Sequence, residues 1–278
     1  MLKIVTDSLS DITSGLAGEL GISVVPVYVR FGEKVYRDRV EITTEEFYRR
    51  LTHEATLPTT TQPTPSDFAE VYNKLAKETN EILVVTLSSK LSGTYQSAVH
   101  AKEMVEGDVR IEVIDSQTVV MGLGVIVISV ARAAQAGASL EEAVALVHGA
   151  MPRSHAIMSF DTLKYLAKGG RIGRAQGLLG SMLSVKPILT IKDGEISPVT
   201  RVRSRAAGID YLYNFVAGFP RIEELAVEHA TTPDEAAALV ERLGALYPKE
   251  KIHPANVSPV IGTYVGPHVL SVSVLAAP

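Results

Sequence analysis

The sequence predicts an α/β protein of two domains: an N-terminal α/β/α layered domain with a largely parallel sheet, and a smaller C-terminal α+β domain. Strand-like and helical patterns alternate through the first 160 residues, which is typical of a layered α/β domain. A hairpin signature then appears, which indicates antiparallel strands. The length of 278 residues fits one large domain or two medium ones, and we place the domains at residues 1–160 and 161–278.

The expected strands of the first domain are mostly continuous aliphatic runs, as in strands buried on both faces of a parallel sheet. They cover residues 2–6, 22–29, 81–87, 109–114 and 156–160. Helices between them begin at recognisable caps. Thr43 with Glu46, and Ser139 with Glu142, match the capping box, in which a hydroxyl and a carboxylate bind the first free N–H groups.

The second domain is expected to contain a hairpin and further strands. The strands cover residues 186–191, 195–203, 223–228 and 268–275. The first two flank Asp193-Gly194, which favours a tight hairpin turn. Thr232, with Pro233 and Glu235, predicts another capped helix, and the alternation of Val/Leu with Ser in the last strand is typical of a half-buried strand.

Composition excludes several classes of protein. Hydrophobic residues make up 46% of the chain and charged residues 21%, which is enough apolar material for a core. The absence of cysteine excludes disulfides, thiolate metal sites and cysteine nucleophiles. The first residues do not form a signal sequence, and the longest apolar stretch, residues 119–130, is too short to cross a bilayer. We therefore expect a soluble, cytoplasmic protein.

Charge is distributed unevenly along the chain. The net charge of −4 argues against nucleic acid as a partner. Residues 153–205 nevertheless carry ten Lys or Arg against three acidic residues, so this basic segment is +7 and the rest of the chain is −11. The segment is either a solvated face or a surface that meets an anion or an acidic partner.

Common catalytic and metal-binding motifs are missing from the sequence. It contains neither a Gly-x-Ser-x-Gly elbow nor a Gly-x4-Gly-Lys-Ser/Thr phosphate loop. The seven histidines are scattered without an i, i+4 pair. We therefore expect neither a metal nor a cofactor.

Two hydroxyl-rich loops are the strongest candidates for a binding site. Residues 57–65 read Leu-Pro-Thr-Thr-Thr-Gln-Pro-Thr-Pro, and residues 87–95 read Leu-Ser-Ser-Lys-Leu-Ser-Gly-Thr-Tyr after a buried strand. Loops at the carboxyl ends of strands line the ligand crevice of open α/β sheets, and helix N-termini there attract anions. The competing interpretation is structural: Ser92 and Thr94 cap a helix, and residues 59–61 form a turn.

A basic, glycine-rich turn follows at residues 168–174, which read Lys-Gly-Gly-Arg-Ile-Gly-Arg. In the simplest interpretation, glycine ends a helix over residues 161–168 and cations lie near its C-terminus. Arg171 and Arg174 also suit contacts to a carboxylate or phosphate.

Taken in order, these motifs resemble the bacterial DegV family of fatty-acid-binding proteins, which includes the lipid-carrying subunit of fatty acid kinase. The resemblance covers nearly the whole chain, and it implies two α/β domains with a long-chain fatty acid held between them. Its landmarks are Thr6-Asp7-Ser8, Thr60-Thr61-Gln62-Pro63, Leu87-Ser88-Ser89-Lys90-Leu91-Ser92-Gly93-Thr94-Tyr95, Lys168-Gly169-Gly170-Arg171-Ile172, Arg201-Val202-Arg203 and Val265-Gly266-Pro267.

The resemblance also implies a site for the head group. Thr60 and Ser92 would hold the fatty-acid carboxylate by hydroxyl hydrogen bonds, with Thr61, Thr94 and Tyr264 as further candidates. The family commonly has histidine at the position of Tyr264, whose hydroxyl can still donate a hydrogen bond.

The same resemblance implies a protein partner, the catalytic subunit of fatty acid kinase, which would make the acyl phosphate. Arg171 and Arg203 match positions expected to engage that subunit. Membrane contact would be transient, for lipid exchange. Residues 119–130, within a helix expected over residues 118–136, and residues 177–183 are either walls of a lipid tunnel or ordinary core helices.

Two functions stay open at this point. In the first, the chain is a lipid-binding accessory subunit and not an enzyme. In the second, it is a self-sufficient phosphotransferase or hydrolase that acts on a small anionic or lipid substrate through Asp7 or Ser92. A catalytic serine needs a positioned base, and the sequence points to none. Asp7 is expected to cap the following helix rather than to bind a metal.

Overall fold

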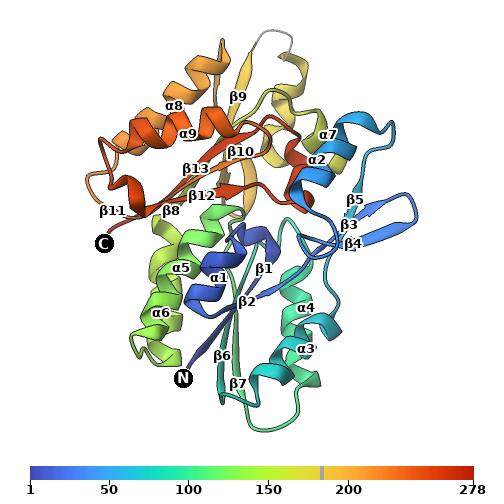
Figure 1. The fold of residues 1–278 in the computed structure, drawn as a ribbon, viewed down its shortest axis with the longest axis vertical. Coiled ribbons are helices and arrows are strands. Elements are labelled where there is room, and N and C mark those ends of the chain that lie inside the picture. The colour runs from blue at the N-terminus through green and yellow to red at the C-terminus, as the bar shows by residue number, and fades with distance from the viewer. Residues whose placement is uncertain (182–184) are drawn as a thin grey trace.

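The computed structural model describes residues 1–181 and 185–278. Figure 1 shows two main sheets, one above the other, with helices packed on both. The described part of the chain contains a four-stranded sheet, a six-stranded sheet and a small three-stranded sheet. The predicted α/β fold, with a parallel N-terminal sheet followed by a further sheet, is confirmed.

The N-terminal sheet is entirely parallel, in the order β2-β1-β6-β7. Its strands are β1 (Lys3–Asp7), β2 (Ile22–Val25), β6 (Glu81–Thr86) and β7 (Arg110–Asp115). All residues of β6 after Glu81 are buried, as expected for a strand covered on both faces. Helices α3 (Pro65–Leu75) and α4 (Thr94–Ala101) cover one face, and α1 (Ser14–Leu20), α5 (Met121–Gln135) and α6 (Leu140–Ala150) cover the other.

The second sheet has the order β10-β9-β8-β13-β11-β12 and is antiparallel except for the β11–β12 pair. Its strands are β8 (Ser154–Ser159), β9 (Lys186–Lys192), β10 (Glu195–Val202), β11 (Ile222–His229), β12 (Ile252–Asn256) and β13 (Leu270–Ala276). Helices α8 (Arg205–Ala217) and α9 (Pro233–Leu243) pack on it. The predicted hairpin is confirmed, because Asp193 and Gly194 both have positive φ and Lys192 pairs with Glu195.

Strand β8 was expected in the sheet of the first domain, and that expectation is wrong. It pairs with β13 and β9, with Ala156 opposite Ser273, so it belongs to the second sheet. Both partners of β8 lie later in the chain, so the local pattern at residues 156–160 could not show which sheet the strand joins. The division into residues 1–160 and 161–278 stays a prediction.

Helix α5 lies between the two main sheets. It packs against β1 and β6 of the first sheet and against β8, β11 and β13 of the second. Within residues 121–130 every side chain except that of Ser129 is buried, and a helix that is apolar all round is a core helix. None of the helices in the two described ranges is both long and apolar enough to cross a bilayer.

The three-stranded sheet brings the first hydroxyl-rich loop into the fold. It has the order β4-β3-β5, with β3 (Tyr28–Phe31), β4 (Lys34–Arg37) and β5 (Thr59–Thr61). The turn expected at residues 59–61 is therefore wrong: Thr60 pairs with Val29. The single strand expected over residues 22–29 is also wrong, because Pro26, which has no N–H, separates β2 from β3.

Three short helices lie near this small sheet and are joined through α10. They are α2 (Thr44–His53), α7 (Lys164–Gly169) and α10 (Pro259–Val265). Helix α10 contacts α2, α7, β3 and β5, so it links the N-terminal and C-terminal parts of the chain. The helix expected over residues 161–168 is thus the shorter α7.

Local cap predictions are mostly confirmed. Thr43 accepts the N–H of Glu46, and Ser139 forms the full capping box with Glu142. Thr232 makes no such bond: its Oγ1 instead accepts a hydrogen bond from Arg205 at 3.5 Å, and Glu235 binds the same guanidinium. The last strand, expected to be half-buried, is wrong in that respect: β13 is buried on both faces, since α5 and α8 both pack on it.

Candidate functional site

The parallel sheet has a topological switch point between β1 and β6, since the chain leaves β1 for β2 on one side and returns as β6 on the other. Ligands of open α/β sheets bind outside the carboxyl ends of the strands at such a point. Leu9 follows β1 and Leu87 follows β6, and both line a cavity of about 500 Å³. Small-molecule sites range over roughly 300–1,000 Å³.

The cavity lies between the two main sheets. Its apolar wall includes Leu9, Leu87, Val120, Met158, Ile196 and Ile261. Met158 belongs to β8 and Ile196 to β10, so the second sheet supplies part of this wall. Its polar lining is Thr60, Thr61, Gln62, Thr64, Ser92, Ser97, Arg171 and Tyr264. The cavity therefore joins an apolar surface to a group of hydroxyls.

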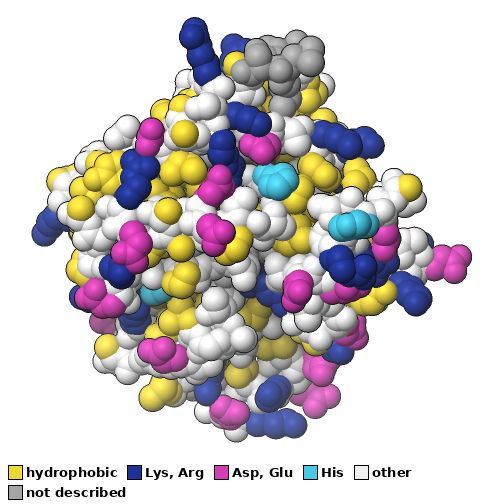
Figure 2. Space-filling view, turned by 45° about the horizontal axis from the view of Figure 1, so that its top comes forward, with side chains coloured by type: hydrophobic (Ala, Val, Ile, Leu, Met, Phe, Trp, Pro, Cys, Tyr) yellow, Lys and Arg dark blue, Asp and Glu magenta, His cyan; other side chains and the backbone are white. Residues whose placement is uncertain are grey.

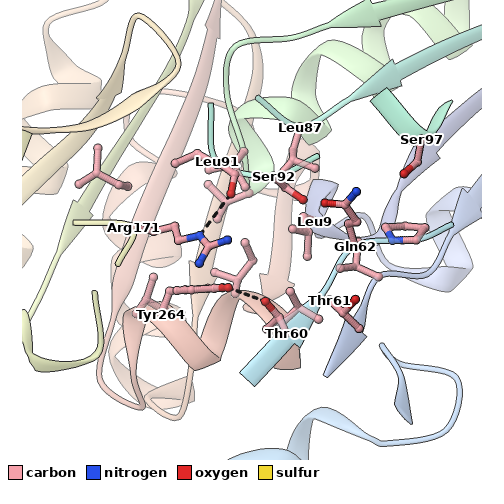
Figure 3. A pocket seen from close by; sticks show the side chains of 18 of the residues that line it. Leu9, Thr60, Thr61, Gln62, Leu87, Leu91, Ser92, Ser97, Arg171 and Tyr264 are labelled. Carbon is pink, nitrogen blue, oxygen red and sulfur yellow. Dashed lines mark hydrogen bonds between the residues drawn. The ribbon is translucent and has the colours of Figure 1, made fainter. Parts of the chain in front are cut away.

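Thr60, Tyr264 and Arg171 meet at one side of the cavity (Figure 3). The hydroxyls of Thr60, in β5, and Tyr264, in α10, hydrogen-bond each other. The Arg171 guanidinium lies 5.3 Å from the centroid of the Tyr264 ring, and it donates to the carbonyls of Leu91 at 3.4 Å and Gly169 at 3.0 Å. Three distant parts of the sequence thus form this corner.

The glycine-rich turn makes this approach possible. Gly170 ends α7 in the left-handed conformation, as predicted for this turn. A Cβ on Gly169 would lie 2.4 Å from Cδ1 of Tyr264, so only glycine lets the turn pack against the ring. The turn therefore delivers Arg171 to the cavity.

Ser92 faces the cavity from the loop before α4 (Figure 3). Its Oγ lies 2.9 Å from Oγ1 of Thr94 and accepts the Thr94 N–H at 3.3 Å. The N-cap residue of α4 is Gly93, so Ser92 does not hold the standard cap position. Among the described residues, no His, Asp or Glu makes a hydrogen bond to Ser92.

Five of the seven residues predicted for the site line the cavity: Thr60, Thr61, Ser92, Arg171 and Tyr264. The other two do not. Thr94 is buried behind Ser92, and Arg203 is exposed in the turn between β10 and α8.

Three polar lining residues, Gln62, Thr64 and Ser97, were not predicted as site residues from the sequence. The Gln62 side chain lies over Gly93, where a Cβ would come within 2.3 Å of the Gln62 Oε1 atom. Ser97 lies in α4, one turn beyond Gly93, and is buried. Their sequence signal is position: Gln62 and Thr64 lie within the first hydroxyl-rich loop, residues 57–65, and Ser97 follows the second.

Asp7 supports the cavity from behind. Its carboxylate accepts the N–H of Leu9 at 3.0 Å and that of Leu87 at 2.8 Å, which ties β1 to β6 at the switch point. It is the N-cap of the 3₁₀ helix Ser8–Ser10, so the predicted cap is confirmed. Burial raises the pKa of Asp7 to about 7. The described ranges hold no group of three or more His, Asp or Glu arranged for a metal ion.

The two segments proposed as tunnel walls, residues 119–130 and 177–183, differ in their contact with the cavity. Val119 and Val120 line the cavity, but the rest of the 119–130 stretch is the core of α5. Leu178, in the second stretch, packs against the main core, and its neighbours Gly177 and Leu179 are exposed. Residues 182 and 183 lie outside the described residues.

Local acids pair with several cations of the basic segment. The pairs include Arg153–Glu223, Arg174–Asp193, Lys186–Asp161 and Arg205–Glu235. Within the ranges that the structure describes, Lys168, Arg171 and Arg203 form no ion pair. Basic and acidic side chains are interspersed over the face seen in Figure 2, so that face carries no broad surface of one sign.

Comparison with known proteins places this geometry in a family. The model of the DegV family, described as uncharacterised proteins, matches residues 1–277. A DegV domain-containing protein from Caldanaerobacter subterraneus is 46% identical over 215 residues, which cover 77% of this chain and 76% of that protein. Another from Streptomyces coelicolor is 36% identical, with 98% of both chains covered.

Solved structures agree with the fold along the whole chain. A fatty-acid-binding DegV family protein from Thermus thermophilus has a TM-score of 0.91 and 34% identity, with 99% of both chains covered. DegV of Bacillus subtilis, a fatty acid binding protein, gives 0.88 and 30%, again with 99% of both chains covered. A stearic-acid-binding protein from Eubacterium ventriosum gives 0.89 and 25%, covering 99% of this chain and 98% of that one.

Proposed function

This chain belongs to the DegV family, and from that premise we propose that it binds a long-chain fatty acid and presents the carboxylate to a separate kinase subunit. One observation carries the proposal: a cavity at the switch point of the parallel sheet joins an apolar wall to a cluster of hydroxyls. Fatty acids have this same division into an apolar tail and a polar head. The solved relatives that bind fatty acids support the assignment.

The tail supplies most of the affinity. Burying a methylene group stabilises a complex by about 0.8 kcal/mol, so a 16-carbon tail offers roughly 10 kcal/mol before ordering costs. The tail lies along the apolar wall formed by residues such as Leu9, Val120 and Met158. The head group then needs to be oriented rather than bound tightly.

Neutral hydroxyls orient the head in this proposal. Thr60 and Ser92 donate to the carboxylate, with Thr61 and Tyr264 beside them, and Thr94 holds Ser92 in place. The Arg171 guanidinium is engaged by two backbone carbonyls. In this proposal the carboxylate keeps its nucleophilic character, because its hydrogen-bond donors are neutral hydroxyls.

The kinase would supply the phosphoryl donor. A carboxylate oxygen attacks the γ-phosphorus of ATP, the new O–P bond forms, and the bond from that phosphorus to the bridging oxygen breaks. ADP leaves with the electron pair. Arg203, exposed without an ion pair among the described residues, and Arg171, at the cavity, are the cations proposed to meet the kinase. We place the protein in the cytoplasm, with only transient membrane contact for lipid exchange.

A self-sufficient hydrolase or phosphotransferase is the alternative. Ser92 and Asp7 would be its nucleophiles. Asp7 is fully buried and bonded to two backbone N–H groups, and the hydroxyl partner of Ser92 is Thr94. A serine nucleophile needs a base within hydrogen-bond reach, so these contacts favour binding over catalysis.

Native mass spectrometry of freshly purified protein tests the binding proposal. We expect a co-purifying long-chain fatty acid in the parent and a lower occupancy in the Thr60→Ala/Ser92→Ala double variant. Each lost charge-assisted hydrogen bond should cost roughly 1.5–3 kcal/mol. Parent-like binding and phosphorylation of the double variant would refute the assignment of the head-group residues.

A coupled assay tests the kinase proposal. The chain alone, with ATP, Mg²⁺ and a labelled fatty acid, should form no acyl phosphate until a fatty acid kinase catalytic subunit is added. Arg203→Ala should lower product formation while lipid occupancy and melting temperature stay unchanged. Turnover without the kinase would support the enzyme alternative instead.

A further inference from the structure

A second cavity adjoins the first at the head-group corner. Its volume is about 330 Å³. Thr60, Arg171 and Tyr264 line both cavities, so these three side chains form the partition between them. We call the second cavity the outer cavity, because the exposed Lys168 lines it, and the first one the inner cavity. The rest of the outer cavity is lined by residues of α7, α10, β5 and the segment before β5, including Tyr165, Lys168 and Thr59.

The charges around this outer cavity have one sign. Its lining contains two cations, Lys168 and Arg171, and no acidic residue. Lys168 is exposed, and its ammonium group makes neither a hydrogen bond nor an ion pair with any described residue. Hydroxyls of Thr59, Tyr165 and Thr263 add polar groups to the wall. This combination suits an anion with several acceptor oxygens.

The position of the partition determines what that anion can be. We consider a fatty acid whose tail fills the inner cavity and whose carboxylate meets Thr60 at the partition. A group that becomes bonded to its carboxyl oxygen lies beyond the partition, on the side of the outer cavity. The next atom beyond that oxygen in an acyl phosphate is phosphorus. The outer cavity begins at the same three residues.

We propose that the outer cavity is a phosphoryl subsite, in which Lys168 and Arg171 bind the phosphate group of the acyl phosphate while its acyl chain stays in the inner cavity. This inference rests on the proposed function. It gives the phosphate group of the product a point of attachment separate from that of the acyl chain. Lys168 then acts on the product and not on the fatty acid, whose carboxylate stops at the partition.

The packing around the partition is consistent with a defined subsite. Gly169 packs against the Tyr264 ring, and a Cβ on Gly266 would lie 2.4 Å from Cδ2 of Tyr165. Both tyrosines are thus held by close backbone contacts, one between the cavities and one in the outer wall. Lys168 and Arg171 lie on either side of the glycine pair Gly169-Gly170 that ends α7, so the same turn positions both cations.

The test uses a stable analogue of the product. In 2-oxoheptadecylphosphonate, a methylene replaces the bridging oxygen of palmitoyl phosphate, so binding can be measured by calorimetry without a kinase. Delipidated parent and Lys168→Gln are titrated with this phosphonate and with palmitate. We expect Lys168→Gln to weaken phosphonate binding about tenfold, equivalent to about 1.4 kcal/mol, and to leave palmitate binding within twofold of the parent.

Lys164→Gln is the matched control, because Lys164 is exposed on the same helix and lines neither cavity. It should leave both ligands unaffected. An equal loss of phosphonate binding in both variants would assign the effect to general positive charge and overturn the subsite. An unchanged ratio of phosphonate to palmitate affinity in Lys168→Gln would also overturn it, while palmitate binding to the parent would leave the proposed function standing.

Discussion

Four buried carboxyl groups lie behind the cavity wall, on Asp7, Asp11, Asp38 and Glu228. Arg39 pairs with Asp11 at 2.6 Å. Ser8 donates to Asp38 at 2.7 Å and accepts the N–H of the lining residue Val27 at 3.1 Å. Burial is the largest cause that raises the pKa of all four groups, to about 7 for Asp7 and for Asp38.

These raised pKa values determine the sign of a pH effect on stability. The folded state binds a proton on Asp38 up to about pH 7, whereas the ordinary value is 3.8. The stabilising contribution of protonated Asp38 is therefore complete below the ordinary pKa and is lost as pH rises through about 7. Above that pH Asp38 is ionised in the folded protein, and its burial lowers the free energy of unfolding.

Asp38→Asn tests this account at a single residue. Asparagine stays neutral at every pH and keeps an acceptor for Ser8. Relative to the parent, the free energy of unfolding of the variant should rise by up to about 1.4 kcal/mol per pH unit between pH 5 and about 7, and the difference should level off above that pH. Urea denaturation at pH 5, 6.5 and 8 measures the difference. Asp108→Asn, at an exposed loop position, is the control, and a pH-independent difference for Asp38→Asn would contradict the account.

Residue identities could be predicted from the sequence where the signal is local. The hydroxyls of Thr60 and Ser92 stand out in polar loops, and both line the cavity. The contact between Thr60 and Tyr264 spans 204 positions, and no local pattern reveals a contact at that separation. Arg171 was assigned to a protein interface, and its turn was also judged suited to a carboxylate or phosphate; in the structure it lines the cavity. The local pattern could not place it there, because the position of its turn depends on the contact between α7 and α10.

At the scale of elements, the packing of α7 against α10 shapes the head-group corner. Gly169 ends α7 directly beneath the Tyr264 ring. Any side chain there must displace the ring, because a Cβ would lie 2.4 Å from its Cδ1 atom. The Thr60–Tyr264 hydrogen bond would break with that displacement.

Gly169→Ala should therefore loosen the corner. We expect a loss of roughly 1–3 kcal/mol in stability from overpacking, and weaker fatty-acid binding because the partition shifts. Thermal unfolding and palmitate titration measure the two effects. Gly149→Ala is the matched control: Gly149 lies within α6 with no atom near its Cβ position, so alanine there should stabilise by about 0.5–1 kcal/mol. If Gly169→Ala behaved like the control, the close approach to Tyr264 would be unimportant.

Elements were predictable where local chemistry alone decides them. The β9–β10 hairpin follows from Asp193-Gly194, and the α6 cap follows from Ser139 and Glu142. Strand β5 was missed because its partner, β3, lies about thirty residues earlier in the chain and the run is only three threonines long. The cap at Thr232 failed, and Arg205, which lies 27 positions earlier, binds both the Thr232 hydroxyl and Glu235. In each failure a contact distant in sequence outweighs the local pattern.

At the scale of the whole molecule, one hydrophobic core extends across both main sheets. It includes Leu83 of β6, Val127 of α5 and Met158 of β8. A second link runs beside it, where Arg39 donates to the carbonyl of Asn256 at 2.5 Å while it pairs with Asp11. The cavity lies between sheets that are already joined by α5, so the ligand adds a further contact to both.

Removing the ligand should therefore weaken the whole fold. A ligand present at one hundred times its dissociation constant stabilises the folded state by about 2.7 kcal/mol, and 1 kcal/mol shifts the melting temperature by roughly 2–4 °C in chains of this class. We expect delipidated protein to melt about 5–10 °C below the palmitate-loaded form, in one transition, because residues of both sheets line the cavity. Differential scanning calorimetry with palmitate added back measures the shift. Hexadecanol, which has the same tail without the carboxylate, should restore only part of it, and equal melting temperatures with and without palmitate would contradict a ligand site between the sheets.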